Sequence, residues 1–197
     1  TGNKYSLWVN VYGVSERYLN VYGEKDLRAQ MNQFFHRTYT HPVDGTTLDM
    51  KMLCNWYWYD ETAILETGKG TKDWNFYRYA ETLLSAAEAI AQSSGVNAEA
   101  AGYLAQVKAR ANMEGKDVST IASELQRLGK QAFIEECWKE RLREFPLEMK
   151  IWDDCVRTGK FPQISATNKG EVQFVDLIGA TNGSGAKLTQ NEGYSAK

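Results

Sequence analysis

The sequence predicts a mainly α-helical fold of tetratricopeptide-like helical hairpins, with long irregular loops and a minor β component. Apolar residues recur at three- and four-residue steps between residues 73 and 145, which is the period of one helix face. The flanking segments lack this period and are rich in Gly, Asn, Thr and aromatic residues. We therefore divide the chain into an irregular aromatic-rich region (1–72), a helical region (73–160) and a loop-rich tail (161–197).

The composition is that of an ordinary globular protein with one sizeable core. The chain has 197 residues, of which 43% are hydrophobic and 24% charged. Its net charge of −2, with no run of Lys or Arg, gives no attraction to nucleic acid or anionic lipid. No stretch approaches the ~18 apolar residues of a membrane span. The opening residues hold neither an initiator Met nor a signal peptide, so we expect any targeting segment to lie upstream or to have been removed.

Residues 1–72 contain several short elements. The β-branched and aromatic residues of 5–14 predict a strand, and residues 21–35 predict one or two helical turns. The segment THPVDGTT at 40–47 predicts a turn because it contains Pro, Asp and Gly. Residues 55–59 (NWYWY) are expected to be extended.

A helical hairpin is predicted between residues 76 and 112. Asp73 is the expected N-cap of its first helix and Gly95 the residue that ends it, while Asn97 is the expected N-cap of the second helix. Small residues in both helices allow a close approach. One such hairpin cannot bury its apolar face alone and needs neighbours. The residues expected on the inner face of the first helix are Phe76, Tyr79, Ala80, Leu83, Leu84, Ala87, Ile90 and Ala91.

A third helix is predicted from Ser119 to Phe145, weakened at Gly129 and ended or kinked by Pro146. A short helix follows at 147–156 and closes at Gly159. In the tail, residues 172–178 predict a strand.

The most informative stretch is 134–160, IEECWKERLREFPLEMKIWDDCVRTGK. It resembles the ERxxEL…E…RWxDLxRxG signature of the SusD/RagB family of outer-membrane nutrient-binding lipoproteins. Residues 78–89 resemble the family's RYAExLLxxAEA helix, residues 109–111 the end of the next helix, and residues 188–194 the closing LxQNPGY. The positions that match the main signature are Glu140, Arg141, Glu144, Glu148, Trp152, Asp154, Arg157, Thr158 and Gly159.

Some positions depart from the family pattern. Met149 stands where the family usually has Gly, Ile151 where it usually has Arg, and Pro146 is unusual in this segment. The WPIP-like strand expected before the closing motif is absent. Family members are typically much longer, with a lipidated cysteine and an N-terminal helical half, so we expect this chain to be a C-terminal portion.

The resemblance implies a function. Proteins of this family capture a glycan or oligosaccharide on the external face of the outer membrane. They pass it to a SusC-like TonB-dependent transporter, on which they sit as a lid. The implied protein catalyses no reaction, needs no cofactor, and touches the membrane only through an N-terminal lipid anchor absent from this chain. Two alternatives stay open: a peptide-binding member of the RagB branch, and a helical-repeat module that binds only protein.

The candidate ligand-binding residues are aromatic. The faces of Trp and Tyr rings stack on the C–H-rich faces of sugars, and their polar tips form hydrogen bonds. If residues 55–59 are extended, alternation places two rings on each face, so that one pair covers the helical layer and the other is exposed. The candidates, all from the less helical part, are Trp8, Trp56, Tyr57, Trp58 and Tyr59.

Catalytic and metal sites are not expected. Asp153 and Asp154, with Glu148, offer the carboxylates of a glycosidase, but adjacent residues of a helix point in different directions. The spacing of Glu140, Glu144 and Glu148 among Arg141 and Arg143 instead predicts ion pairs that tie two helices together.

The residues that could form other reactive sites are sparse. His36 and His41 lack further nearby metal ligands. Cys54, Cys137 and Cys155 lack a CxxC pair; a disulfide between the last two and a set of buried free thiols both fit the spacing, and we favour free thiols.

Overall fold

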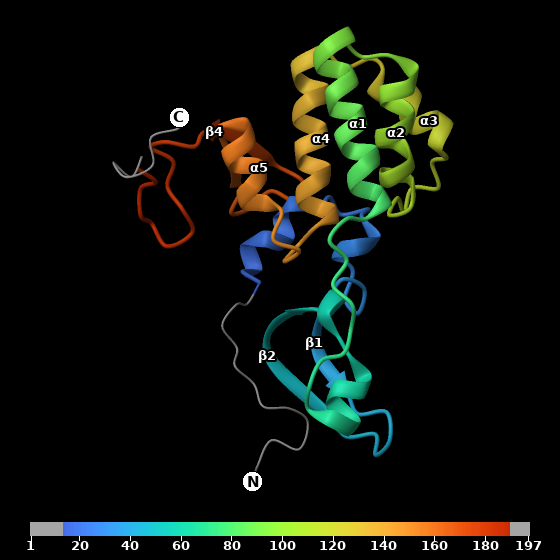
Figure 1. The fold of residues 1–197 in the computed structure, drawn as a ribbon, viewed down its shortest axis with the longest axis vertical. Helices are drawn as coiled ribbons and strands as arrows, with labels where there is room; N and C mark the ends of the chain where they lie inside the picture. The colour runs from blue at the N-terminus through green and yellow to red at the C-terminus, as the bar shows by residue number, and fades with distance from the viewer. Residues whose placement is uncertain (1–13, 190–197) are drawn as a thin grey trace.

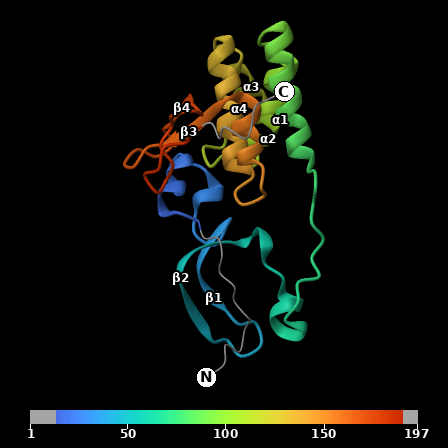
Figure 2. The same cartoon turned by 60° about the vertical axis from the view of Figure 1, so that its left-hand side comes forward.

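The computed structural model of the chain describes residues 14–189, apart from the side chain of Lys51. A layer of upright helices forms one end of the molecule, and a long β-hairpin projects from its base (Figures 1 and 2). The predicted strand at 5–14 and the candidate Trp8 lie outside the described residues, except for Val14, which forms a bridge with Leu53. The mainly helical fold predicted from the sequence is confirmed.

Four helices form the main core. They are α1 (Tyr79–Ser94), α2 (Ala98–Ala109), α3 (Val118–Leu125) and α4 (Lys130–Glu144). Helix α1 packs against α2 and α4, and α3 packs against α2. The buried core side chains come from all four helices and include Leu84, Ala87, Ala101, Leu104, Val107, Ile121, Leu125, Phe133 and Cys137.

The helical hairpin is confirmed, but its first helix begins later than predicted. Asn97 caps α2 by accepting a hydrogen bond from the backbone N–H of Ala100, and Gly95 ends α1 with φ +82°. Asp73 caps no helix, because the backbone stays extended up to Arg78. Phe76 and Tyr79, expected in the core, are both exposed.

The predicted third helix is two helices. Helix α3 ends at Leu125, and Gly129, a poor helix former, is the N-cap of α4. The break lets α3 pack on α2 while α4 turns back to pack on α1, which one straight helix cannot do. Helix α4 ends at Glu144, directly before Phe145 and Pro146, as the proline predicts.

A second, smaller core at the base of the helices joins residues 21–53 to α4 and to the segment after it. Helix α5 (Ile151–Thr158) closes at Gly159 with φ +67°, and β3 (Lys160–Ile164) pairs antiparallel with β4 (Val172–Asp176). The predicted strand at 172–178 is thus confirmed. The buried residues here are Val21, Tyr22, Phe35, Leu53, Leu142 and Val172.

The projecting hairpin consists of β1 (Phe35–Thr40) and β2 (Thr47–Asn55), which pair antiparallel. The predicted turn joins them, with Gly45 at φ +70°. Both strands lie in a region expected to be irregular. Within the predicted helical segment 21–35, the structure has a 3-10 turn at Leu27–Ala29. A second 3-10 turn precedes it at Glu16–Val21, and a π-helical turn lies at Ala63–Thr67.

The three cysteines are free thiols, as favoured from the sequence. Cys137 and Cys155 are buried, and burial raises the pKa of Cys155 to about 11. In the described part of the chain, none of the helices combines the length and apolar character needed to cross a bilayer.

Candidate functional site

Three glutamates of the family signature lie buried at the foot of α4, where they form what we call the charged clasp with arginines from distant segments. Glu144, only 1% exposed, pairs with Arg28, Arg78 and Arg110. Glu148 binds the Arg78 guanidinium at 2.7 and 2.8 Å. The predicted ion pairs are therefore present, and they join α4 to the start of α1, the end of α2 and residue 28.

Glu140 completes the charged clasp. Its carboxylate is fully buried and pairs with Arg28 at 2.8 Å and with Arg143 at 3.1 Å. Burial works against the charged form of Glu140, but Arg28, Lys108 and Arg143 outweigh it and hold the pKa of the carboxyl well below its usual range. A carboxylate so firmly ionised and enclosed has no proton to give or take at neutral pH, so its role is structural.

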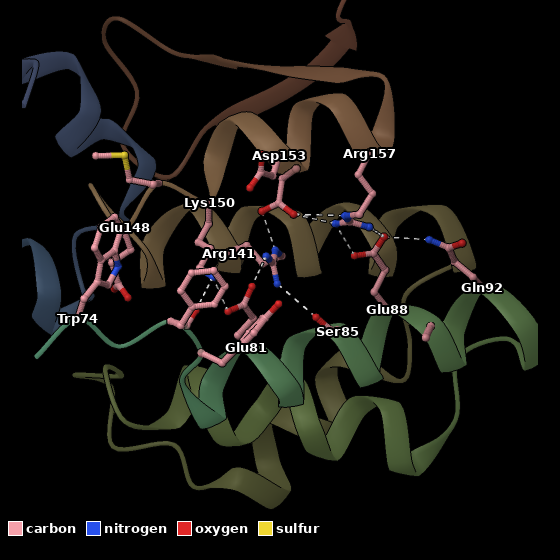
Figure 3. Close-up of a pocket in the computed structure, with 15 residues that line it drawn as sticks. Trp74, Glu81, Ser85, Glu88, Gln92, Arg141, Glu148, Lys150, Asp153 and Arg157 are labelled. Carbon is pink, nitrogen blue, oxygen red and sulfur yellow. Dashed lines mark hydrogen bonds and ion pairs between the residues drawn. The ribbon is translucent and has the colours of Figure 1, made fainter. Parts of the chain in front are cut away.

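A second line of charged groups joins α1 to α4 and α5. Arg141 binds Asp154 at 2.6 Å and Glu81 at 3.2 Å. Arg157 donates two hydrogen bonds to the Glu88 carboxylate, at 2.7 and 3.0 Å, and also binds Asp154. We call this line, drawn in Figure 3, the charged ladder. It consists of Glu81, Arg141, Asp154, Arg157 and Glu88.

The charged ladder lines an open groove of about 690 Å³ between α1 and α5. One end of this groove carries three aromatic side chains from the extended link that leads into α1. Trp74, Phe76 and Tyr77 are 60, 71 and 73% exposed, and we call them the aromatic rim. The Lys150 ammonium lies 4.8 Å from the Tyr77 ring centroid and 5.7 Å from that of Phe76, and donates to the Phe76 carbonyl. The groove thus combines exposed rings with hydrogen-bonding groups.

The predicted aromatic cluster is a turn, not an extended segment. Residues Trp56–Trp58 form a 3-10 turn, capped by the Asn55 side chain, which accepts from the Tyr57 N–H. In a 3-10 turn, residues three apart lie on the same side. Trp56 and Tyr59 therefore stack, with ring centroids 4.6 Å apart, and the expected alternation of two Trp against two Tyr is wrong.

Trp56 has its faces covered. His36 stacks on it with a centroid distance of 3.9 Å and an interplanar angle of 13°. Tyr59 also stacks on this indole, with an interplanar angle of 10°. Burial lowers the pKa of His36, against an opposing hydrogen bond at Gln33, and it raises the pKa of Tyr59 to about 12.

Trp58 connects the hairpin to the aromatic rim. It is 38% exposed, and its Nε1 donates to the Leu147 carbonyl at 3.1 Å. One neighbour is Tyr57, edge-on at 4.9 Å, and another is Trp74, edge-on at 5.8 Å. Of the predicted ligand-binding residues that the structure describes, Trp58 is thus the one that lies beside the groove.

Tyr57 and Trp56 line a second, smaller cavity of about 440 Å³. Arg78, Arg110 and Glu144 of the charged clasp also border it. Its aromatic walls are half-buried, whereas the rings of the larger groove are open, so the larger groove is the better candidate for binding.

The sequence pattern does not identify Trp74 and Tyr77 as site residues, because it predicts that a helix begins at residue 73. A signal was nevertheless present: three aromatic residues in four positions immediately before the RYAE motif. A helix with that many rings in its first turn exposes some of them.

The two adjacent aspartates differ from expectation. Both Asp153 and Asp154 border the groove. The groove is wide enough to contact side chains that leave α5 in different directions. Asp154 is held by Arg141 and Arg157, so the two do not form a pair poised for acid and base catalysis. Among residues 14–189, no group of three or more His, Cys, Asp or Glu side chains could hold a metal ion.

Comparison with known proteins gives the family. No curated protein matches the chain. The fold is similar to the crystal structure of a SusD superfamily protein from Parabacteroides distasonis, with a TM-score of 0.76 and 26% sequence identity. That match covers 96% of this chain and 40% of the relative, so the chain spans less than half of the relative's length. The family model described as SusD family matches residues 12–194, nearly the whole chain, and we conclude that this chain belongs to the SusD family.

Proposed function

We propose that the groove between α1 and α5 binds an oligosaccharide. The observation that carries this proposal is the pairing of the open aromatic rim with the charged ladder in one groove of about 690 Å³. A sugar ring presents a C–H-rich face, which stacks on Trp or Tyr, and a circle of hydroxyl groups, which bond to carboxylate and guanidinium groups. Trp58 extends the aromatic surface towards the hairpin.

The biological role that we propose is the one that the family resemblance implies. The protein acts in nutrient uptake, on the external face of the outer membrane, as part of a lipoprotein. It delivers its glycan to a SusC-like TonB-dependent transporter and catalyses no reaction. Support for this role comes from membership of the SusD family and from the openness of the groove, since a carrier must release its cargo.

A second candidate ligand is a peptide, and the charged ladder favours it. A peptide backbone has donors and acceptors that match alternating carboxylate and guanidinium groups. The aromatic rim distinguishes the two, because a sugar depends on stacking more than an extended peptide does. Binding of a transporter alone, with no small ligand, would instead favour a protein-interaction module.

Glycan-array binding followed by calorimetry tests the proposal. Trp74→Ala and Tyr77→Ala should each weaken glycan binding about tenfold or more, since one aromatic stacking contact is worth about 1.4 kcal/mol or more. Trp58→Ala should weaken it less, because Trp58 lies beside the groove rather than on its wall. Trp56→Ala should affect glycan binding only indirectly, by changing the shape of the 3-10 turn that positions Trp58.

Trp152→Ala is the matched control, because Trp152 is an exposed indole on α5 that does not line the groove. If Trp152→Ala lowers affinity as much as Trp74→Ala, the groove is not the site. Glycan binding that survives Trp74→Ala and Tyr77→Ala together would also refute the proposal.

A further inference from the structure

We infer that the groove selects neutral or amine-bearing glycans and rejects glycans that carry carboxylate or sulfate groups. This inference rests on the proposed function and adds the substrate class. It follows from the way the charged groups of the groove are already paired, because a ligand can use only the charges that remain.

The three cations of the groove are all engaged by the protein's own carboxylates. Arg141, with a side chain only 8% exposed, lies between Glu81 and Asp154. Lys150, also mostly covered, pairs with Glu81 at 3.1 Å. Neither offers a charge that an anionic ligand could reach without breaking an existing pair.

Arg157 is the most accessible cation, since its side chain is 46% exposed. Glu88 nevertheless occupies two of its N–H groups, at 2.7 and 3.0 Å, and Asp154 accepts a further bond at 3.0 Å. Gln92 donates to the same Glu88 carboxylate and keeps it in place. An acidic sugar would have to break the bidentate Arg157–Glu88 ion pair before it could pair with Arg157 itself.

The anions of the groove outnumber its cations. Glu81, Glu88 and Asp154 are paired within the ladder, and Glu148 is paired with Arg78. Asp153 borders the groove and is exposed, and in the part of the chain that the structure describes its carboxylate has no ion pair or hydrogen bond. The uncommitted charge that faces a ligand is therefore negative, and it repels a ligand anion.

The aromatic rim reinforces this preference. The negative faces of aromatic rings attract cations and repel anions. Lys150 already demonstrates the geometry, since its ammonium lies near the faces of Tyr77 and Phe76. Both the Asp153 carboxylate and an open ring face therefore attract an amino group on a sugar, and both repel a sulfate or a uronate.

An array of oligosaccharides that carries neutral, amino-sugar, uronate and sulfated members of equal length tests the inference, at low and high salt. At low salt the uronate and sulfated members should bind at least about tenfold more weakly than neutral ones, and amino sugars equally or more tightly. High salt should narrow both differences. Acidic members that bind as tightly as neutral ones at low salt would overturn the inference.

Two substitutions sharpen the test. Asp153→Lys should reduce the discrimination against acidic glycans at least severalfold, while Glu24→Lys, an equal charge change at an exposed residue outside the groove, should leave it unchanged. An equal effect of both would mean that the overall charge decides, and the inference would fall. If no glycan of any class binds, the proposed function fails as well; if neutral and acidic glycans bind alike and Trp74→Ala weakens both, only the selectivity is wrong.

Discussion

The charged clasp and the aromatic groove lie side by side but are built on opposite principles. The carboxylates of the clasp are buried and fully paired, on residues that belong to the family signature. The aromatic rim of the groove is open to solvent. Glu148 borders both the groove and the smaller cavity. The densest charge in the sequence therefore serves the scaffold, and the least regular segment supplies the surface that a ligand can reach.

Removing one carboxylate of the clasp should have the largest effect on stability. Glu144→Ala leaves Arg28, Arg78 and Arg110 facing one another without their shared anion. Breaking a buried pair from one side typically costs about 3–5 kcal/mol. The free energy of unfolding from urea titration should fall by that amount.

The matched control is Glu124→Ala, which breaks an exposed pair with Lys116 and should cost less than about 1 kcal/mol. Equal losses in the two variants would show that the clasp does not stabilise the helices.

Acid should remove the stability that the buried ion pairs of α4 contribute. Glu136 also lies on α4, where it pairs with Lys108 and Arg143. The pKa values of Glu140 and Glu136 are both lowered in the folded protein by their cationic partners, which outweigh burial. A lowered folded-state pKa contributes stability that is complete above the unfolded value of 4.5 and is lost as the pH falls below it. Each unit of lowering is worth about 1.4 kcal/mol per group.

Urea titrations between pH 7 and pH 3 measure this loss. The free energy of unfolding should hold steady down to about pH 5 and then fall. Glu140→Gln should start less stable and show a shallower fall. A wild-type stability that stays flat down to pH 3 would contradict the prediction.

The hairpin should respond separately from the helices. Trp58→Ala removes the hydrogen bond to the Leu147 carbonyl and the contact with Trp74. We expect local opening of β1 and β2 to become easier by about 1–2 kcal/mol, seen as faster amide exchange in the hairpin and unchanged exchange in α1 and α4.

Trp58→Phe keeps a ring but no donor, and should have an intermediate effect. Val43→Ala at the exposed hairpin turn should have none. Faster exchange throughout the helices after Trp58→Ala would show that the two regions unfold together.

The sequence was informative where structure depends on neighbours along the chain. The period of α1 and α2, the Asn97 cap and the stop at Pro146 are local, and each was predicted. For the clasp, the sequence predicts that the charged residues form ion pairs, but it does not predict their distant partners. The partner Arg28 lies 116 residues from Glu144, and no local pattern can specify such a contact.

The site was predicted less well for the same reason. Aromatic residue type pointed to residues 56–59, but the 3-10 turn, set by the Asn55 cap, decides that Trp56 is covered and Trp58 is not. Trp74 and Tyr77 are exposed because two long-range contacts keep their segment out of the helix. Arg78 pairs with Glu148, and Lys150 donates a hydrogen bond to the Phe76 carbonyl.

The turn that joins the clasp to the groove offers the smallest effect, and one of opposite sign. After Pro146 the chain reverses through two left-handed residues, Leu147 at φ +60° and Met149 at φ +61°. Met149 stands where the resemblance to the family leads us to expect Gly, the residue that a left-handed backbone favours. Such a conformation costs a side chain about 1–2 kcal/mol, while Gly loses about 0.5–1 kcal/mol more than other residues through the freedom of the unfolded chain.

Met149→Gly should therefore stabilise the protein by up to about 1 kcal/mol, measured by urea titration. Met113 is also exposed and lies in a turn, but its backbone is not left-handed. Met113→Gly should thus destabilise by about 0.5–1 kcal/mol. If both substitutions destabilise equally, the Met149 side chain contributes more at the groove than its backbone strain costs. Met149 would then count as part of the binding surface rather than of the scaffold.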